Sequence, residues 1–420
     1  MSSRWSGLGG HYWRLLASST ASNLADGIFQ VAVPLLAVSL TRSPLQVAGV
    51  ALAARLPWLL FTLHAGAIAD RLDRRRIMLS VEAGRTLLIA AFAAAVAADV
   101  EGLPLLYAVA LVLGIGETLY DTSAQSIMPM LVAPADLERG NGALQTSELV
   151  MNEFVGPPLG GLLAAVALSL AFTTSAAIYA VAVAALLLVR GNYRVERRAQ
   201  RPMRVEIAEG VRYLMRHRLL RSLAFMLGTM NMASTAVYAI LPLYAVAPGP
   251  MGLSSFGFGI LLTSFAVGGA LGGLATARVV AAAGRARVLF LAVVFEAVAL
   301  AIPAATSEPW VVGPVIAVGG FMTAMWNVLT VSLRQRIIPA ELFGRVNSCY
   351  RLFGWGAMPL GAVLGGALAQ AAGVRSVFLA AGALVGTIAI VLPRVAGEGD
   401  IASAEEEAAA ERVAGQAVTA

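Results

Sequence analysis

Long apolar stretches alternate with short polar connections along almost the whole chain. An α-helix needs about 20 mostly apolar residues to cross the hydrocarbon core of a bilayer. The pattern therefore predicts twelve membrane-spanning helices, over about 15–39, 45–66, 77–98, 103–130, 141–165, 170–190, 218–246, 255–277, 286–305, 309–333, 345–369 and 374–393.

Composition agrees with this pattern, because 59% of the residues are hydrophobic and only 13% are charged. Such values exclude an ordinary soluble domain. The first apolar run is too long for the core of a signal peptide and no clear cleavage site follows it, so we expect it to remain as a span. The predicted fold class is an all-α membrane protein with twelve transmembrane helices.

The basic residues orient the predicted helices. All 30 are arginine, and they gather in the connections on one face, while Arg42 and Arg375 lie on the other. Positive charge beside span ends marks the cytoplasmic side. We therefore expect both termini to be cytoplasmic and the chain to lie in the plasma (inner) membrane. Charge placed in this way favours contact with anionic lipid and not with nucleic acid.

An internal repeat divides the chain into two six-helix halves. Asn23-Leu-Ala-Asp26 in the first span matches Asn231-Met-Ala-Ser234 in the seventh, at an offset of 231 − 23 = 208 residues. Transporters built from such repeats bind their ligand between the halves, near the middle of the bilayer. The predicted parts are an N-terminal tail, a first bundle, a linker, a second bundle and an acidic C-terminal tail, at 1–14, 15–190, 191–217, 218–393 and 394–420.

The linker and the tail carry opposite charges. Between 190 and 221 there are ten arginines and three glutamates, which gives 10 − 3 = +7. Apolar residues at helical spacing over 205–220 predict either an amphipathic helix on the inner membrane surface or a solvated linker helix. The Ala-rich acidic tail lacks residues for a core, so we expect it to be disordered or loosely helical.

A charged motif lies between the second and third spans, with the residues Gly66, Asp70, Arg71, Arg74 and Arg75. Its spacing, Gly-x-x-x-Asp-Arg-x-x-Arg-Arg, resembles the motif that joins helices 2 and 3 in the major facilitator superfamily. The resemblance implies that the glycine permits close helix approach and that the charged residues help to hold the cytoplasmic side shut. The alternative is a loop that only fixes orientation.

A second motif in the fifth span resembles the antiporter signature of drug-exporting major facilitators, with Gly156, Pro157, Gly160 and Gly161. Proline removes a backbone hydrogen bond and glycine allows close packing, so ordinary helix packing is an alternative explanation. The motif is incomplete, since Asn152 stands where a glycine is usual. As a whole the chain resembles the drug and proton antiporter branch that includes macrolide efflux proteins and the enterobactin exporter.

Ionisable side chains inside spans are candidate functional residues, because a charge in the bilayer is costly. Asp26 and Arg55 both lie roughly 17 Å from the cytoplasmic end of their spans at 1.5 Å per residue, so they are predicted to reach the same depth and to form an ion pair. Such a pair is either part of proton coupling or only structural.

Four further acids belong to the fourth and fifth spans: Glu117, Asp121, Glu148 and Glu153. Glu117 and Asp121 are four residues apart and therefore share a helix face. Neighbouring acids in a low dielectric do not easily ionise together, which makes them candidate proton carriers. The alternatives are that some face water, or that Glu148 pairs with a cytoplasmic arginine.

The second half has fewer acids at the corresponding positions, so we expect it to supply an apolar and aromatic wall for the substrate. Its candidate residues are Asn231, Ser234, Phe321, Met322, Met325, Trp326, Asn327, Phe353 and Trp355. Packing in the core or against lipid is the alternative for each aromatic or methionine side chain.

Together these features predict a secondary transporter that exports amphipathic small molecules by alternating access, in exchange for protons. The alternatives are an uptake symporter or facilitator of the same fold, and a membrane enzyme. No Ser-His-Asp set supports an enzyme, and His11, His64, His217 and the single Cys349 are too scattered for a metal site. No ATP-binding loop is present, so we expect a proton gradient as the energy source. We also expect no cofactor and a monomer.

Overall fold

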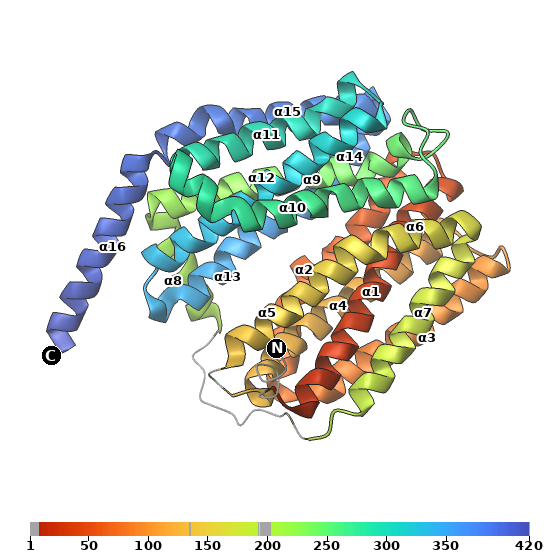
Figure 1. The fold of residues 1–420 in the computed structure, drawn as a ribbon, viewed down its shortest axis with the longest axis horizontal. Helices are drawn as coiled ribbons and strands as arrows, with labels where there is room; N and C mark the ends of the chain where they lie inside the picture. Colours follow the sequence, from red (N-terminus) through yellow and green to blue (C-terminus); the bar gives the residue numbers. More distant parts are fainter. Residues whose placement is uncertain (1–7, 134–135, 192, 194–202, 420) are drawn as a thin grey trace. The chain divides into compact units, whose positions relative to one another are not determined.

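The computed structural model describes residues 8–133, 136–191, 193 and 203–419 (Figure 1). Within these residues every regular element is helical, apart from one isolated bridge between Val246 and Leu253. Twelve helical segments of the described chain are long and apolar enough to cross a membrane. The predicted all-α fold with twelve spans is confirmed. The first span begins earlier than predicted, at Gly9, and the eighth continues to Ala283.

The chain divides into two compact units, Met1–Arg197 with Leu241–Thr263, and Arg198–Ile240 with Ser264–Ala420. The first unit holds α1 (Gly9–Leu40), α2 (Pro44–Arg71), α3 (Arg74–Ala97), α4 (Leu103–Leu131), α5 (Leu137–Glu148), the π-helix η4 (Leu149–Val155), α6 (Gly156–Val166) and α7 (Leu168–Leu187).

The remaining helices begin with α8, which belongs to the linker. They are α8 (Met203–Arg216), α9 (Arg218–Ala245), α10 (Ser255–Ala283), α11 (Arg285–Ala305), α12 (Pro309–Ile337), α13 (Ala340–Gly356), α14 (Met358–Ala372), α15 (Val374–Val391), the short 3₁₀-helix η5 (Leu392–Arg394) and α16 (Glu398–Thr419).

In the first unit, α1 packs against α6 and α7, α2 packs against α4, and α3 packs against α4 and α7 (Figure 1). Their shared core includes fully buried aliphatic and aromatic side chains, among them Ile28, Leu36, Phe172 and Tyr179. This packing brings α1, α3 and α7 together around the polar residues described below.

Two glycines allow α1 and α6 to approach until their backbones touch. A Cβ atom added to Gly156 would lie 2.5 Å from the Cα of Gly27, and one added to Gly27 would lie 2.9 Å from the Cα of Gly156. The neighbouring Gly160 faces the backbone of Ile28 in the same way. Gly156 and Gly160 of the second motif thus allow α6 to pack closely on α1, whereas Gly161 faces the backbone of Ser255 in α10.

The linker helix α8 packs on another helix of its unit, α13. Leu214 is fully buried, Gly210 faces the backbone of Arg345, and Arg345 Nη1 donates to Glu209 Oε2 at 2.7 Å. A helix break at His217 separates α8 from α9. The expectation of a helix over 205–220 is therefore correct in kind, but the helix is packed against protein and is not simply solvated.

The acidic tail forms a helix, so of its two expected states, disordered or loosely helical, the structure agrees with the helical one. Ile401 of α16 is buried, and Glu405 Oε1 accepts from Arg285 Nη1 at 2.5 Å. Glu398 Oε1 accepts from the backbone N–H of Ala286 at 2.8 Å, where α11 begins without a side-chain cap of its own. The tail needs no core of its own, because it adds to the ends of α11 and α12.

Replacing Gly156 by alanine should weaken the folded state by about 1–3 kcal/mol, because the new methyl group collides with backbone atoms that cannot turn away. Gly84→Ala is the matched control, since nothing lies within 4 Å of a Cβ added there. That change should be neutral or stabilising by up to about 1 kcal/mol. Thermal unfolding of the purified protein in detergent measures both. Equal stability of the two variants would contradict the close contact.

Candidate functional site

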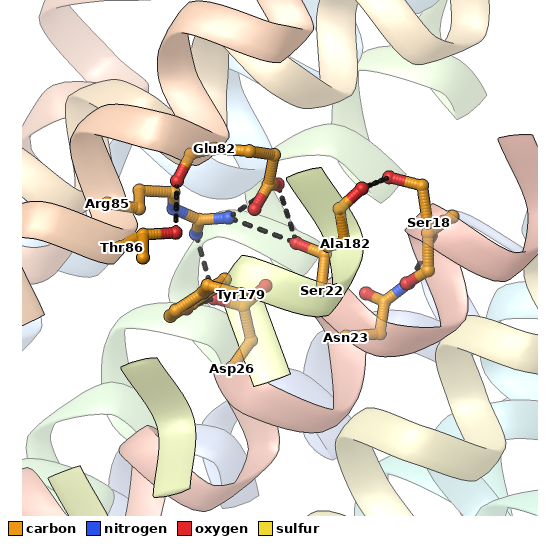
Figure 2. Close-up of polar contacts among 10 residues, drawn as sticks. Ser18, Ser22, Asn23, Asp26, Glu82, Arg85, Thr86, Tyr179 and Ala182 are labelled. Atoms are coloured by element: carbon orange, nitrogen blue, oxygen red, sulfur yellow. Dashed lines mark hydrogen bonds and ion pairs between the residues drawn. The ribbon is translucent and has the colours of Figure 1, made fainter. Parts of the chain in front are cut away.

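An arginine buried in α3 joins two carboxylates. The side chain of Arg85 is 4% exposed, and its Nη2 donates to Asp26 Oδ1 of α1 at 2.7 Å. Its Nη1 donates to Ser22 Oγ at 3.3 Å and lies 3.5 Å from Oε1 of Glu82, which is fully buried. Figure 2 shows the guanidinium between these side chains. A buried cation is tolerated where it is paired in this way.

Hydroxyl groups complete this cluster. Tyr179 of α7 donates from Oη to Asp26 Oδ1 at 2.6 Å, and its ring centroid lies 5.0 Å from the guanidinium carbon of Arg85. Ser22 Oγ donates to Glu82 Oε1 at 2.8 Å, while Glu82 Oε2 has no hydrogen-bond partner in the described part of the chain. With both acids ionised the cluster carries 1 − 2 = −1, so one negative charge is not balanced within it.

The partner of Asp26 is Arg85, which corrects the predicted pair with Arg55. Arg55 is exposed and belongs to α2, which packs against α4. There it interacts electrostatically with Glu117 and Glu153. Counting residues along two helices gives the depth of each side chain but not the direction in which it points, and this direction separates Arg55 from Asp26.

Sequence reasoning passed over three members of the cluster. Glu82 and Arg85 lie inside the predicted span 77–98, so the rule that marked Asp26 would have marked them as well. Tyr179 gave no such signal, because an isolated tyrosine in an apolar span is ordinary.

The other predicted acids come from neighbouring helices of the same unit. Glu117 and Asp121 of α4 and Glu153 of η4 are half-buried, whereas Glu148 of α5 is exposed. Asp121 interacts electrostatically with Glu117 and Glu148. Glu117 interacts in turn with Asp26, and Glu153 with Glu148. The structure therefore brings Glu117, Asp121 and Glu148 into the electrostatic surroundings of Asp26, and Glu153 joins them through Glu148.

This carboxyl-rich centre consists of Asp26, Glu82, Glu117, Asp121, Glu148 and Glu153. The arginines that interact with its members are Arg55 and Arg85. Six carboxyl groups against two guanidinium groups give 2 − 6 = −4 if every acid is ionised. Such an excess of one sign in a low dielectric opposes full ionisation.

The π-helix η4 places Glu153 directly before the second motif. Pro157 and Pro158 have no N–H for the carbonyl groups of Glu153 and Phe154, and their rings crowd these carbonyls. The wider turn over Leu149–Val155 accommodates both effects. Single π-helical turns of this kind are frequent at functional sites.

The residues of the charged loop motif bind the end of α2 and the start of α3 to neighbouring helices. Arg74 Nη1 donates to the carbonyl oxygen of Ser126 in α4 at 2.8 Å, and Arg75 Nη2 donates to that of Leu187 in α7 at 3.2 Å. Arg71 is exposed. The side chain of Asp70, and the surroundings of Gly66, lie outside the described residues.

Asp73, which sequence reasoning did not select, also ties this loop down. Its Oδ1 accepts from the backbone N–H of Arg76 at 3.0 Å and so caps α3. Its Oδ2 accepts from the backbone N–H of Tyr193, beyond the end of α7, at 2.8 Å. Aspartate is a preferred N-cap residue, and Asp73 stands directly before the first residue of α3, so the sequence did contain this signal.

Some of the residues expected to form a substrate wall are buried in the structure and others are exposed. Trp326 is 1% exposed and lies in the core of the second unit, because its large ring is enclosed by packing. Asn327 and Trp355 are exposed, and the Arg351 guanidinium carbon lies 4.2 Å from the Trp355 ring centroid. In this structure Trp326 is therefore a packing residue and not a wall residue.

Two of the three polar members of that set, Asn231 and Ser234, form side-chain hydrogen bonds within the second unit. Asn231 Nδ2 donates to the carbonyl oxygen of Gly354 at 2.9 Å. Ser234 Oγ donates to Oε1 of Glu296 in α11 at 2.8 Å. Glu296 is a buried acid that sequence reasoning missed, although it lies inside the predicted span 286–305.

An open apolar groove of about 570 Å³ lies on the first unit, between α1, η4 and α7, and is lined in part by Leu24, Met151 and Ile178. None of the carboxyl groups described above lines this groove.

In the part of the chain that the structure describes, no three or more His, Cys, Asp or Glu residues form a group that could hold a metal ion.

Twelve helices long and apolar enough to cross a membrane, together with a carboxyl-rich centre, define a multi-pass membrane protein. The model of the family described as "Transmembrane secretion effector" matches residues 2–417, which is almost the whole sequence. The chain therefore belongs to this family, a part of the major facilitator superfamily.

Relatives with known names agree with this assignment. The multidrug efflux pump Tap of Mycolicibacterium fortuitum is 28% identical over 411 residues, which cover 93% of this chain and 97% of the relative. Macrolide efflux protein A of Streptococcus pyogenes is 25% identical over 406 residues, covering 91% and 95%. Both relatives are efflux transporters by name and not enzymes, and this chain, as a member of the major facilitator superfamily, is likewise a transporter and not an enzyme.

Solved structures show the same fold at low sequence identity. The nucleoside transporter NupG superposes with a TM-score of 0.74 at 14% identity, covering 92% of this chain and 99% of that one. A bacterial homologue of the iron transporter ferroportin in its inward-facing state superposes with a TM-score of 0.66 at 19% identity, covering 91% and 98%.

Arg85→Gln should destabilise the protein by about 3–5 kcal/mol, because it leaves the buried carboxylate of Glu82 and the half-buried one of Asp26 without their cation. Arg42→Gln is the control, since Arg42 is exposed in the connection between α1 and α2, and should cost about 1 kcal/mol or less. Adding Asp26→Asn to Arg85→Gln should restore part of the loss. Thermal unfolding in detergent measures these differences. If both single variants unfold alike, Arg85 does not hold the cluster together.

Proposed function

We propose that this protein exports amphipathic small molecules, of the drug or macrolide type, in exchange for protons. The observation that carries the proposal is the carboxyl-rich centre of the first unit, with six acids and two arginines. Protons are the simplest cations that such a centre can take up, because uptake removes like-charge repulsion. The named relatives, a multidrug efflux pump and a macrolide efflux protein, support export and this class of substrate.

Asp26 is the member of this centre whose protonation would change contacts between helices. Its Oδ1 accepts from Arg85 of α3 and from Tyr179 of α7. A proton on Asp26 removes the charge that attracts Arg85, which still has Glu82 on its own helix. Protonation therefore weakens the contact between α1 and α3 without leaving the arginine unpaired.

Alternating access requires such a local change to alter the balance between inward- and outward-open states. In transporters built from repeats, this occurs when one bundle moves against the other around a central site. We propose that the carboxyl-rich centre binds a proton on one side of the membrane and releases it on the other. The energy source is then the proton gradient, no cofactor is needed, and one chain is a complete transporter.

Transport into inverted membrane vesicles tests the function. With an acidic interior, the vesicles should accumulate ethidium or a macrolide, and nigericin should abolish the accumulation. Asp26→Asn and Asp121→Asn should each lower it to the level of vesicles without the protein. Asp99→Asn is the matched control, because Asp99 is exposed in the turn after α3, and it should leave transport unchanged.

Unchanged pH-driven transport in a variant carrying both Asp26→Asn and Asp121→Asn would overturn proton coupling through these residues. Movement of the probe out of the vesicles together with protons would instead identify an uptake symporter. Probe movement that follows its own gradient and ignores pH would identify a facilitator.

Both termini are proposed to be cytoplasmic in the plasma (inner) membrane, because arginines flank the connections on that face. A green fluorescent protein fused after Ala420 should therefore fluoresce, whereas alkaline phosphatase at the same place should be inactive. Phosphatase inserted at Asp99, on the opposite face, should be active. The reverse pattern of activities would contradict this topology.

A further inference from the structure

A second buried carboxyl group lies in the other unit, away from the carboxyl-rich centre. Glu296 of α11 is 7% exposed. Its Oε1 accepts from Ser234 Oγ of α9 at 2.8 Å, and its Oε2 accepts from Thr323 Oγ1 of α12 at 3.1 Å. Each carboxyl oxygen thus has one hydroxyl partner, and the three residues come from three different helices.

The internal repeat relates this acid to Arg85. Arg85 follows the first residue of α3 by 85 − 74 = 11 positions, and Glu296 follows the first residue of α11 by 296 − 285 = 11. The partner of Arg85 is Asp26, and Ser234 is the residue that matches Asp26 at the offset of 208. The same junction between repeated helices therefore holds an ion pair in one unit and a carboxyl–hydroxyl pair in the other.

No ion pair reaches Glu296 from the described residues. On its own helix the nearest arginine is Arg287, which lies 296 − 287 = 9 residues and therefore about 13 Å away along the axis at 1.5 Å per residue. The elements packed around it carry these charged and titratable residues with described side chains: Arg218, Arg221, Tyr238 and Tyr244 on α9, Arg334 and Arg336 on α12, Arg375 on α15, Arg394 on η5, and Glu398, Asp400, Glu405, Glu406 and Glu407 on α16.

These residues do not neutralise Glu296. The arginines lie in the first or last turns of their helices, and two of them, Arg285 and Arg336, are paired with Glu405. The Tyr238 ring packs against Phe265 of α10. An ionised Glu296 would therefore be a buried charge without a counter-ion, which a membrane interior strongly disfavours.

The two hydroxyl partners fit both protonation states. A serine or threonine hydroxyl can donate or accept a hydrogen bond, so Ser234 and Thr323 can donate to a carboxylate or accept from a carboxylic acid. When they do not donate to Glu296, they can donate to a carbonyl one turn back in their own helices. Arg85, which lies at the matching junction of the first unit (Figure 2), has no acceptor and can only donate to a carboxylate.

We propose that Glu296, held by Ser234 and Thr323, is a proton-binding site of the second unit. The carboxyl group takes up a proton to become neutral and releases it to become a carboxylate, with no other atom exchanged. Its use in transport rests on the proposed proton-coupled export, whereas the binding of the proton does not.

Infrared spectroscopy of the full chain in lipid nanodiscs tests this site. The C=O stretching band of a protonated carboxyl group, taken as the difference between wild type and Glu296→Gln, should be present at low pH. It should disappear as the pH is raised across the range in which the folded protein is stable. Glu407→Gln is the control, because Glu407 is exposed on α16, and it should leave that band intact.

The hydroxyl partners supply a second test that does not depend on the glutamine variant folding. Ser234→Ala and Thr323→Val each remove a donor that stabilises the carboxylate. Each should move the loss of the band to higher pH by about one pH unit or more. A merely structural carboxylic acid would show no pH-dependent band to shift.

A band that is absent throughout this pH range, or present and unchanged throughout it, would overturn the proposal. Loss of the band on replacing choline chloride by sodium chloride at constant pH would overturn it too, since the site would then bind sodium. If the band behaves as expected but vesicle transport ignores the pH gradient, the proposed function fails and the proton site stands. If transport follows the gradient and the band is absent, only the proton site fails.

Discussion

The buried guanidinium of Arg85 is the constraint on which the first six-helix unit depends. A cation inside a bilayer costs several kcal/mol unless it is paired and hydrogen-bonded. Arg85 meets this condition through Asp26 of α1, Glu82 of its own helix, Ser22, and the face of Tyr179. Each partner must be held at a fixed place, so the close packing of α1, α3 and α7 and the pairing of the charges support one another.

The close approach of α1 to α6 also helps to fix the position of α1, the helix that carries Asp26. Gly27 and Gly156 bring the two backbones into contact, one residue away from Asp26 on α1. On α6 the contact begins directly after the π-helical turn that carries Glu153. The glycines, the prolines and the acids are therefore parts of one local structure, in which the backbone irregularity lies where carboxyl groups gather.

The second unit shows that the repeat preserves positions more strictly than charge. Glu296 occupies the place of Arg85, and Ser234 the place of Asp26. Outside its membrane-spanning helices, this unit also holds α8 through Glu209 and Arg345, and α16 through Glu405 and Arg285. Arginines at the helix ends thus have partners within the protein, in addition to their effect on membrane orientation.

The amino-acid sequence by itself determined the twelve helices and their order. In a bilayer every backbone hydrogen bond must be made locally and each span needs a minimum apolar length, so runs of apolar residues are enough to find them. The same sequence marked Asp26, Asp121 and Glu153 as unusual, because charge in a span is rare. It also contained the signals for Glu82, Arg85 and Glu296, which lie inside predicted spans.

Only the tertiary structure decided which side chains meet. The rise along a helix gave Asp26 and Arg55 the same depth, yet the direction of each side chain and the choice of neighbouring helix placed Arg85 beside Asp26 instead. The docking of the acidic tail likewise depends on a partner surface that its own residues do not encode. Depth follows from counting residues, whereas contact depends on rotation about the helix axis and on packing, which are properties of several helices at once.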